Sequence, residues 1–556
     1  MSRPSSFARP AVAAATAAAL LAACADRDLT APSAARPDAV TIAPSEAPAL
    51  AVAATTVAPE LPRTTMNTDW VEPTGRRLRV PAGGNLQAVI DSARGGDVIL
   101  LQAGAVYRGN FRLRSKPAGS AWITIMTDTP LPAPGTRMTP ARAATLAKLV
   151  AVTTEPTLFT RTGAHHYRIV GVEITAPTSI TSMASAIVAF GYGGSPQTTL
   201  ESTVHHLTLD RVYVHGHPTL NVKRCVALNS ATSAVVDSYL SDCHSKTQDS
   251  QAIAGWNGPG PFKIVNNHLE GAGENIMFGG ATPTIPNLIP SDIEIRGNHV
   301  FKPLAWKGVW LVKNLFELKC AQRVLLEGNV FENSWRDGQT GFAAVLKSDG
   351  PSSQSWMITQ DVTMRYNVLR NVAGGVNIAA NPNNSVQPAR RIRLEHNLLT
   401  GVGTSNGTTT DRAFQVVDDL RDVALVHNTV IPNTSTGLVI IFDGSQGSNL
   451  TVKDNVWIKG QYGMVASGEP EGTAGLDHYW SSWTWANNVQ VGFTASRYPS
   501  SNFAPSTVAG VGFVDYAGGD YRLAATSAYA GRASDGTNPG ADVAAVLTRT
   551  AGAVVR

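Results

Sequence analysis

Charged side chains recur at corresponding places in two short apolar segments of this chain. In LFELK, residues 315–319, the alternation of apolar and polar groups turns the carboxylate of Glu317 and the amine of Lys319 to the same outer face. In AAVLK, residues 343–347, it turns Lys347 to that face as well. A neutral lysine can take a proton, and a carboxylate can hold a cation. These positions therefore favour proton-transfer chemistry beside a cation.

The loops that lead into such segments contain most of the other groups that could take part in chemistry, and they are densest from residue 214 to residue 347. Each side chain alone is ordinary surface, so the cluster is the evidence. The candidates for proton transfer and charge neutralisation are Lys313, Lys319, Arg336 and Lys347. The candidate metal ligands are Asp249, Glu274, Glu317 and Asp337. The candidates for binding a substrate by hydrogen bonds or by ring faces are His215, His217, His244, Trp256, Trp306, Trp335, Asn377 and Arg412.

A recurring phrase predicts how these positions are brought together. Two alternating apolar residues are followed by an Asn and then by another apolar group. The phrase is found at 262–269, 293–300, 324–331, 362–369, 392–399, 423–430 and 450–457, with the Asn at 267, 298, 329, 367, 397, 428 and 455. A period near 30 residues, with strand-like alternation inside each unit, is typical of a solenoid. We expect the Asn side chains to sit at a bend and to form a hydrogen-bonded ladder.

A second strand is expected once per coil, before the Asn phrase, as in residues 275–279, 315–319 and 343–347. Two or three short strands per coil with little helix between them are typical of a parallel β-helix. A sandwich would show hairpin turns at closer spacing. Leucine-rich repeats would show an LxxLxL pattern, and helical repeats a period of 3.6 residues.

The ends of the repeat region agree with this interpretation. The segment 83–109 starts with an amphipathic stretch that predicts a helix over the open end of the first coil, followed by the strand DVILLQ. Together with the Asn-bend coils, this segment resembles the right-handed parallel β-helix proteins of the pectate-lyase-like superfamily. The resemblance covers residues 78–545 and implies an all-β right-handed solenoid of about 10 coils with an N-terminal capping helix. We also expect a surface helix over 138–150, and a Trp-rich loop at 468–485 that contacts carbohydrate or packs as a lid.

The N-terminal residues predict that the protein is exported from the cytoplasm. Residues 1–24 combine early arginines with a short apolar stretch and end in LAAC, which resembles a bacterial lipobox with Cys24 as the lipidated residue. Residues 25–65 are rich in Ala, Pro and Thr, as in a flexible tether. We expect a monomer in the cell envelope, attached to the membrane only through this lipid, or a secreted protein if Cys24 merely follows an ordinary secretory signal.

The composition limits the classes of ligand that the protein is expected to bind. Charged residues make up 15% of the chain and the net charge is +4, which permits an acidic ligand without requiring one. No basic run or aromatic-basic pattern indicates nucleic acid. The cysteines besides Cys24 are Cys225, Cys243 and Cys320, and the preferred interpretation is buried thiols, with a Cys225–Cys243 disulfide as the alternative.

Basic groups, carboxylates and tryptophans together suit an acidic sugar polymer. The first hypothesis is a polysaccharide lyase that cleaves a uronate-containing glycan by β-elimination, with Lys313 or Lys319 as the base and Arg336 and Lys347 as clamps on the substrate carboxylate. The resemblance implies Ca²⁺, held by aspartates or glutamates, as the neutralising cation. No local motif matches one lyase family closely enough to transfer its residues.

Two alternatives stay open. A glycoside hydrolase of the polygalacturonase type needs two carboxylates at a suitable separation, but Asp418–Asp419 is the only DD pair and the NTD and GHG motifs of that type are absent. A surface protein that binds glycans without turning them over, or that has a structural role, fits a lipid anchor and a solenoid equally well.

Overall fold

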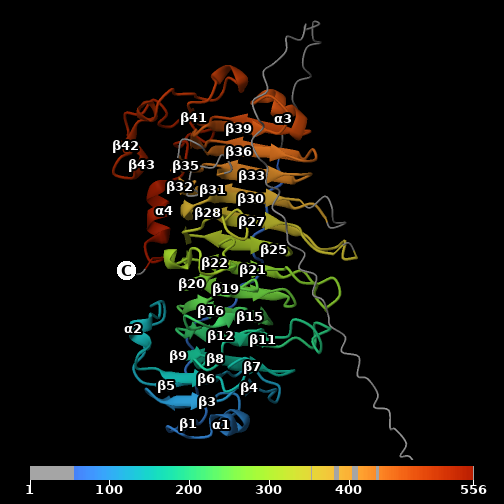
Figure 1. Ribbon diagram of the computed structural model, residues 1–556, viewed down its shortest axis with the longest axis vertical. Coiled ribbons are helices and arrows are strands. Elements are labelled where there is room, and N and C mark those ends of the chain that lie inside the picture. Colours follow the sequence, from blue (N-terminus) through green and yellow to red (C-terminus); the bar gives the residue numbers. More distant parts are fainter. Residues whose placement is uncertain (1–55, 352, 381–386, 404–410, 434–436, 555–556) are drawn as a thin grey trace, which may run out of the picture.

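Three long parallel sheets, named A, B and C, stack coil upon coil along one axis (Figure 1). The computed structural model describes residues 56–351, 353–380, 387–403, 411–433 and 437–554. Each coil passes once through each sheet, so strands far apart in sequence become neighbours. The parallel β-helix predicted from the sequence is confirmed.

Sheet A has 14 strands. They are β1 (Arg77–Val80), β2 (Val98–Gln102), β5 (Ile123–Asp128), β8 (His165–Val170), β12 (His205–Asp210), β16 (Ala231–Val236), β19 (Gly260–Val265), β22 (Ser291–Arg296), β25 (Ala321–Glu327), β28 (Thr359–Arg365), β31 (Arg390–Glu395), β34 (Arg421–Val426), β37 (Ser448–Lys453) and β40 (Trp483–Ala486).

Sheet B has 13 strands. They are β3 (Val106–Arg108), β6 (Ala147–Val150), β9 (Val172–Thr175), β13 (Tyr213–His215), β17 (Tyr239–Cys243), β20 (His268–Gly271), β23 (His299–Phe301), β26 (Val330–Glu332), β29 (Val368–Val372), β32 (Leu398–Val402), β35 (Thr429–Pro432), β38 (Val456–Ile458) and β41 (Val489–Val491).

Sheet C has 12 strands. They are β4 (Phe111–Leu113), β7 (Leu158–Thr160), β11 (Val188–Gly191), β15 (Arg224–Asn229), β18 (Gln251–Gly255), β21 (Glu274–Phe278), β24 (Phe316–Leu318), β27 (Phe342–Lys347), β30 (Gly374–Ala379), β33 (Arg412–Val417), β36 (Leu438–Asp443) and β39 (Tyr462–Ala466).

The remaining elements are short and lie outside the three sheets. They are the strand pairs β10 (Ser182–Met183) with β14 (Asn221–Val222) and β42 (Phe513–Asp515) with β43 (Asp520–Leu523), the helices α1 (Leu86–Ser92), α2 (Pro140–Ala143), α3 (Thr473–Tyr479) and α4 (Val543–Thr550), and the 3₁₀ turns Leu304–Trp306, Ala495–Arg497 and Val508–Val511. None of the helices in the described part of the chain combines the length and apolar character of a membrane span.

The sheets hold more coils than the roughly ten expected, because the early coils lack the Asn phrase and are hard to count from sequence. Where the phrase occurs, the expected ladder forms. Each Asn Nδ2 donates to the Oδ1 of the next Asn, at 3.0 Å from Asn267 to Asn298 and 2.9 Å from Asn329 to Asn367. The ladder continues beyond the predicted last member, Asn455, to Asn488 and Asn502.

The bend itself is made by the residue before each ladder Asn. Asn266, Tyr366 and His396, for example, have positive φ angles of 57°, 54° and 52°. The prediction placed the bend at the ladder Asn, whereas that Asn satisfies buried backbone and amide groups one coil away. A residue that turns the chain and a residue that stabilises the turn are therefore neighbours, each with one task.

The N-terminal cap is confirmed, since α1 lies over the first coil with Leu86 and Ile90 buried in the main core. The helix expected over 138–150 is wrong except for the four residues of α2, because Ala147–Val150 forms the sheet B strand β6. The alternation Ala147, Leu149 with Lys148 outward suits a strand better than a helix. At 468–485 the packed-lid alternative fits, because Trp480, Trp483 and Trp485 are buried in the main core.

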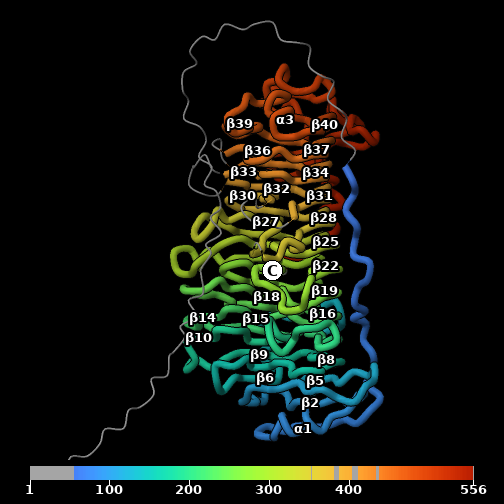
Figure 2. Tube along the Cα trace, turned by 90° about the vertical axis from the view of Figure 1, so that its right-hand side faces the viewer, coloured from blue at the N-terminus to red at the C-terminus, as the bar shows by residue number. Residues whose placement is uncertain are grey.

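An N-terminal arm, residues 56–70, runs along the outer face of sheet A, in the direction opposite to that in which successive coils are added (Figure 2). The backbone N–H groups of Val57, Glu60 and Arg63 donate to aspartates on three separate strands of that sheet. Further along, Met66 is 3% exposed and packs against β16. The last ten residues of the expected tether, 56–65, are therefore docked on the solenoid, whereas residues 1–55, including Cys24, lie outside the described residues.

Cys225 and Cys243 form a disulfide between β15 and β17, with their Cα atoms 5.6 Å apart. The preferred expectation of buried thiols is wrong for this pair and holds for Cys320, where burial raises the thiol pKa to about 12. The pairing could not be predicted from the sequence, because only the geometry of the coils brings these two strands from different sheets together. Closing this loop of the unfolded chain stabilises the fold by about 2–4 kcal/mol.

Candidate functional site

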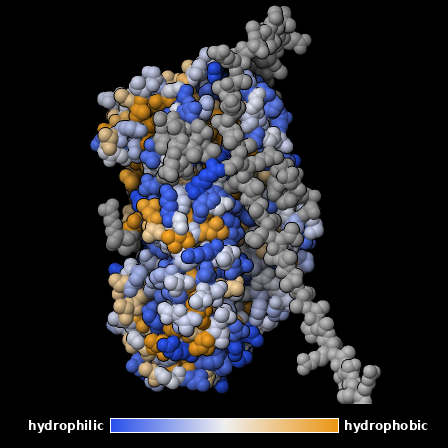
Figure 3. All heavy atoms as spheres, in the orientation of Figure 1, coloured by the Kyte–Doolittle hydropathy of each residue, from blue (hydrophilic) through white to orange (hydrophobic). Residues whose placement is uncertain are grey.

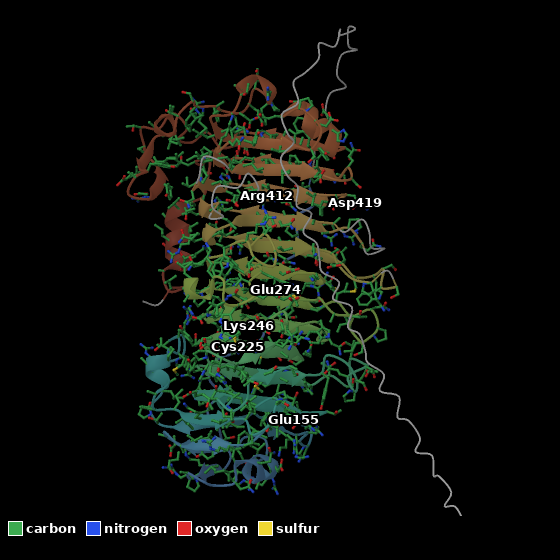
Figure 4. All side chains as sticks on the ribbon, in the orientation of Figure 1. Glu155, Cys225, Lys246, Glu274, Arg412 and Asp419 are labelled. Atoms are coloured by element: carbon green, nitrogen blue, oxygen red, sulfur yellow. A yellow bond between two sulfur atoms is a disulfide. The ribbon has the colours of Figure 1, made fainter. Side chains whose placement is uncertain are left out.

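The outer face of sheet C brings carboxylates and lysines together across successive coils. In the strand register Glu317 lies beside Val345, which lies beside Asn377, and Lys319 directly follows β24 as Lys347 ends β27. The in-and-out alternation predicted for LFELK and AAVLK is therefore correct. Figure 4 places Glu274 and Arg412 on separate coils of the same stack, with Glu274 nearer its middle.

We name the group formed around these strands the acid–lysine cluster. It consists of Asp249, Gln251, Glu274, Lys313, Asn314, Glu317, Lys319, Lys347 and Asp349. Its members come from β18, β21, β24 and β27 and from the residues directly flanking those strands. Neighbouring strands lie ~4.8 Å apart, so four coils bring the whole set within reach of one extended ligand. In the view of Figure 3, strongly hydrophilic groups lie near the middle of the long axis.

The first half of the cluster is centred on Glu274. Lys313 Nζ lies 2.6 Å from Asp249 Oδ1 and 4.0 Å from Glu274 Oε1, so one ammonium serves two carboxylates from different coils. Gln251 Nε2 donates to Glu274 Oε2 at 2.8 Å. The Glu274 carboxylate is 1% exposed, which makes it a buried anion supported by one amide and one cation.

The second half is centred on Glu317 and Asp349. Glu317 is also 1% exposed and accepts a hydrogen bond from Asn314 Nδ2 at 3.2 Å, with Lys319 Nζ at 3.5 Å. Asp349 then bridges the two outer lysines, at 3.8 Å from Lys319 Nζ and 3.3 Å from Lys347 Nζ. Two ammonium groups from adjacent coils thus share one carboxylate at the edge of the cluster.

The electrostatics of the two halves differ. Burial, and next the charges of Glu317 and Asp249, raise the pKa of Glu274 to about 7, against the opposing effects of Lys313 and Gln251. Burial lowers the pKa of Lys313, but Glu274, Asp249 and Glu317 outweigh it and raise that pKa above its ordinary value. Lys313 is therefore held as a cation, which suits a clamp and does not suit a base.

Lys302 supports the cluster from behind and was not singled out from the sequence. Its Nζ is fully enclosed and donates to the carbonyl oxygens of Gly271, Ala272 and Gly273 and to Asn275 Oδ1, at 2.5–3.0 Å. The three carbonyl groups belong to the residues that lead into Glu274, and Asn275 directly follows it. Burial lowers the pKa of Lys302 to about 7, and the charge of Glu274 opposes that change. The lysine fixes the backbone on which Glu274 is mounted.

In the part of the chain that the structure describes, Asp249, Glu274 and Glu317 do not bring three carboxylate oxygens within 4.8 Å of one another, so the pair Glu274 and Glu317 with Gln251 is the set that fits a calcium ion. Among the described residues, Gln251 Oε1 is buried without a hydrogen-bond partner, beside the mutually repelling carboxylates of Glu274 and Glu317. Ca²⁺ takes carboxylate and amide oxygens. A divalent cation there would use the unsatisfied oxygen and relieve the repulsion, and Glu274, Glu317 and Gln251 are the residues that would hold it, whereas Asp249 pairs with Lys313.

Of the sixteen predicted site residues other than Cys24, the acid–lysine cluster contains six: Asp249, Glu274, Lys313, Glu317, Lys319 and Lys347. Asn377 extends the row, 3% exposed, with Oδ1 buried and lacking a hydrogen-bond partner among the described residues. Arg412 is 1% exposed and lies over the Phe342 ring at 5.9 Å, so it packs within sheet C instead of reaching a ligand.

The predicted histidines do not belong to this face, which corrects the expectation. His215 lies on sheet B, where its Nε2 is 2.9 Å from Glu173 Oε1. His217 is buried, with Nε2 3.1 Å from the Ile180 carbonyl oxygen. His244 is 1% exposed and stacks on Trp310 at 3.6 Å. Loop length alone did not reveal which side of the coil each histidine would face.

The predicted tryptophans also differ from the expectation. Trp306, Trp310 and Trp335 form a buried cluster with Ala272 and Val312, so Trp306 and Trp335 offer no open ring to a sugar. Trp256 is half-buried, and the Arg224 guanidinium covers its ring at 4.5 Å. These rings brace the loops that carry Lys313 and Gln339, because packing their large apolar area against one another is favourable.

Arg336 and Asp337 are exposed in the loop before β27. Asp337 Oδ2 accepts a hydrogen bond from the Val312 N–H at 2.8 Å, which ties this loop to the one carrying Lys313. In the same loop, Gln339 Oε1 accepts a hydrogen bond from Asn314 Nδ2 at 2.7 Å. Asp337 therefore holds two loops together and does not lie beside Glu274 and Glu317, so the prediction of Asp337 as a metal ligand with them is wrong.

Sequence reasoning missed Gln251, Asn314, Lys302 and Asp349. A signal existed for Asp349, since it follows the outward Lys347 by two residues and so repeats its side of the chain. The amides carried no signal, because Asn and Gln are common in turns of this protein, and only the register shows which of them meet a carboxylate.

The fold resembles several solved structures, although no family model and no curated protein matches the chain. An alginate lyase from Paenibacillus sp. str. FPU-7 is 13% identical over 77% of this chain and 99% of its own, with a TM-score of 0.28. A PL6 family polysaccharide lyase from Pseudopedobacter saltans is 12% identical over 77% and 96%, with a TM-score of 0.39. A tailspike protein of E. coli bacteriophage HK620 is 10% identical over 76% and 62%, with a TM-score of 0.39. These likenesses concern the coiled architecture alone.

Proposed function

We propose that the chain is a carbohydrate-active enzyme, a polysaccharide lyase that cleaves a uronate-containing glycan by β-elimination at the acid–lysine cluster. The observation that carries the proposal is the pairing, on one sheet face, of the buried carboxylates Glu274 and Glu317 with lysines that meet at Asp349. β-Elimination needs both parts, namely a cation site that neutralises the uronate carboxylate and an amine that reaches the proton beside it.

The reaction breaks two bonds and forms one double bond within the sugar. A base removes the C5 proton, the electrons of the C5–H bond form the C4–C5 double bond, and the C4–O4 bond breaks as O4 receives a proton. Lys319 and Lys347 are the candidates for the two proton transfers, because each lies at the outer edge of the cluster. Lys313, whose pKa is raised, stays charged and holds Asp249 and Glu274 in place.

Ca²⁺, when bound, would neutralise the substrate carboxylate and so lower the cost of charge that develops on it during C5 deprotonation. Glu274, Glu317 and Gln251 are the proposed ligands. The chain itself orients the carboxylates through Lys302, Asn314 and Gln251, which fix backbone or oxygen positions before any ligand arrives. Asn377, farther along the row, is the proposed contact for the next sugar.

A panel of uronate glycans tests the proposal by absorbance of the unsaturated product, with and without a chelator. We expect product on at least one glycan, its loss with chelator, and its restoration by added Ca²⁺. Lys319→Ala and Lys347→Ala should each reduce kcat by at least about 100-fold, the usual scale of a lost acid or base. Lys148→Ala is the matched control, because Lys148 pairs with Glu173 on sheet B, away from the cluster, and should leave the rate unchanged.

A glycoside hydrolase is the second candidate, and the raised pKa of Glu274, about 7, is the observation that favours it. A carboxylic acid that keeps its proton near neutral pH can act as a general acid. The same panel separates the two, since a hydrolase would release reducing ends without the absorbance of an unsaturated uronate. Saturable glycan binding with neither product would instead support a binding protein and would sink both enzymatic proposals.

The membrane anchor is proposed from the sequence alone, because Cys24 lies outside the described residues. Incorporation of a labelled fatty acid into the chain, lost in Cys24→Ser, is the expected result. Equal labelling of the two proteins would exclude this residue as the anchor.

A further inference from the structure

Two consecutive histidine pairs lie one above the other at the start of adjacent strands in sheet A. His165 and His166 begin β8, His205 and His206 begin β12, and the register sets His205 beside His165. His166 and His206 both have a φ of 56°, the left-handed geometry, so their rings turn the same way and stack at 4.3 Å. The rings of His165 and His205 stack at 5.2 Å.

Three ring nitrogens converge in this group. One nitrogen each from His166, His205 and His206 lies within 4.8 Å of the other two. Within each pair the Nδ1 atoms also face each other, at 2.9 Å between His165 and His166 and at 2.7 Å between His205 and His206. Uncharged nitrogens this close need either a shared proton or a cation between them.

The hydrogen bonding favours lone pairs directed inward. His165 Nε2 lies 3.2 Å from the Lys116 carbonyl oxygen, so this nitrogen carries the hydrogen and donates it. Its Nδ1 is then a lone pair that accepts a hydrogen bond from the Nδ1–H of His166, which leaves the Nε2 of His166 as the lone pair available to a metal ion. His165 therefore orients the ring of His166 from outside the ligand set, as a group that hydrogen-bonds to a metal-binding histidine does.

The surroundings suit neutral imidazoles. Burial, and then the neighbouring histidines, lower the pKa of His166 to about 4, and they lower the pKa values of His205 and His206 as well. Trp122 closes one side, with its ring centroid 5.4 Å from that of His166 in an edge-on arrangement. On the other side the register sets the small Ala231 beside His205.

We infer that His166, His205 and His206 form a binding site for a first-row divalent metal ion of the zinc class, with His165 at its border. Three imidazole nitrogens with an open fourth position are a common ligand set for Zn²⁺, and imidazole also suits Co²⁺, Ni²⁺ and Cu²⁺. The site is separate from the oxygen-rich acid–lysine cluster, which suits Ca²⁺, and it does not depend on the proposed function.

The site would link coils that lack the asparagine ladder. The ladder Asn residues start at Asn267 in the coil of β19, whereas the histidines lie in the coils of β8 and β12. A metal ion shared between these two strands would cross-link them as the ladder amides link later coils. The inferred role is therefore structural, as a clamp on the N-terminal third of the solenoid.

The test uses the full chain without a polyhistidine tag and Zn²⁺ alone as the probe. Calorimetric titration should saturate at one Zn²⁺ per chain, and added Zn²⁺ should raise the thermal midpoint relative to chelator-treated protein. His166→Ala and His206→Ala should each weaken binding by more than about tenfold, a loss that even outer-shell changes can reach. His396→Ala is the matched control, since His396 and His427 stack at 4.7 Å outside this group, and it should bind as the wild type does.

A second measurement keeps the inference testable if a variant folds poorly. Co²⁺ added to the wild-type chain should give the visible absorption of nitrogen-coordinated cobalt, displaced by Zn²⁺. The inference is overturned if the wild type binds no Zn²⁺ saturably, if folded His206→Ala binds as tightly as the wild type, or if Co²⁺ shows only the spectrum of the hydrated ion.

Discussion

Sheets A and C carry charged rows on their outer faces, yet the two rows are built differently. On sheet A the charges alternate from strand to strand, as in Arg296, Glu327, Arg365 and Glu395. Glu327 has an arginine on either side, at 3.0 Å and 2.5 Å. On sheet C, Glu274 and Glu317 are buried near each other and the lysines gather at the outer edge.

The difference teaches that charge content alone does not mark a site. Alternating opposite charges across strands satisfy one another and stabilise the sheet. Like charges held close together are unfavourable, and they persist where a ligand or a reaction uses them. Sheet A therefore has a structural face, and the arm covers part of it, whereas sheet C has a face whose charges are incompletely balanced.

Exchanging one glutamate for glutamine on each sheet should give opposite effects on stability. Glu274→Gln removes a like-charge contact and should leave the free energy of unfolding unchanged or higher by about 1 kcal/mol, since an isosteric neutral group suits this buried place. Under the proposed function it should also lower the lyase rate by at least about 100-fold, because charge neutralisation at the substrate is lost.

Glu327→Gln is the sheet A counterpart and should leave the lyase rate unchanged. It leaves three guanidinium groups, those of Arg296, Arg365 and Arg549, around a neutral amide with no carboxylate to pair with. Those arginine side chains are 28–45% exposed, so water screens the lost attraction and we expect a loss of about 1–2 kcal/mol. Urea unfolding of both variants measures the comparison, and a similar loss from Glu274→Gln would contradict the distinction between the two faces.

The pH dependence of stability should also differ in sign between the faces. The pKa of Glu274 is raised to about 7, above its value in the unfolded chain. Its stabilising contribution is therefore complete below about pH 4.3 and is lost as the pH rises through about 7, a change of about 3 kcal/mol that Glu274→Gln should remove. Unfolding curves between pH 5 and pH 8 measure this loss.

Asp292 on sheet A should behave in the opposite way. Burial opposes ionisation there, but hydrogen bonds from Arg323 and from the Arg63 N–H lower the pKa of Asp292 below its ordinary value. Its contribution is present above the unfolded pKa of about 3.9 and is lost as the pH falls through the folded value. Asp292→Asn should therefore flatten the stability curve on the acid side only, and an effect confined to neutral pH would count against this assignment.

The same contrast explains which features the sequence could predict. Alternation within LFELK and AAVLK fixed the outward direction of Glu317, Lys319 and Lys347, because strand geometry leaves two choices only. Loops allow many directions, and so the positions of His244 and Trp335 were wrong. Their burial depends on packing between loops of neighbouring coils. The charge alternation on sheet A was equally hidden, since it becomes visible only in the register.

The arm offers the finest test of the sheet A face, because its spacing matches that of the coils. Val57, Glu60 and Arg63 are three residues apart, and the aspartates that accept their N–H groups, Asp422, Asp361 and Asp292, lie two strands apart. Two strands span ~9.6 Å. Three residues of polyproline II span ~9.3 Å, and prolines 59 and 62 favour that conformation.

One inserted residue should break this match, and three should preserve it. An alanine inserted between Glu60 and Leu61 shifts the first two donors away from their aspartates, at a cost of about 2 kcal/mol for one exposed and one part-buried charge-assisted bond. A second copy of Glu60–Pro62 supplies a new donor for Asp361 and moves the old one to Asp422. Hydrogen exchange of the Glu60 N–H should be faster in the first protein and unchanged in the second, with the lyase rate equal in both. If both insertions accelerate exchange alike, the arm is held by its anchor at Met66 and not by the periodic match, and the covered face of sheet A is then a consequence of chain connectivity alone.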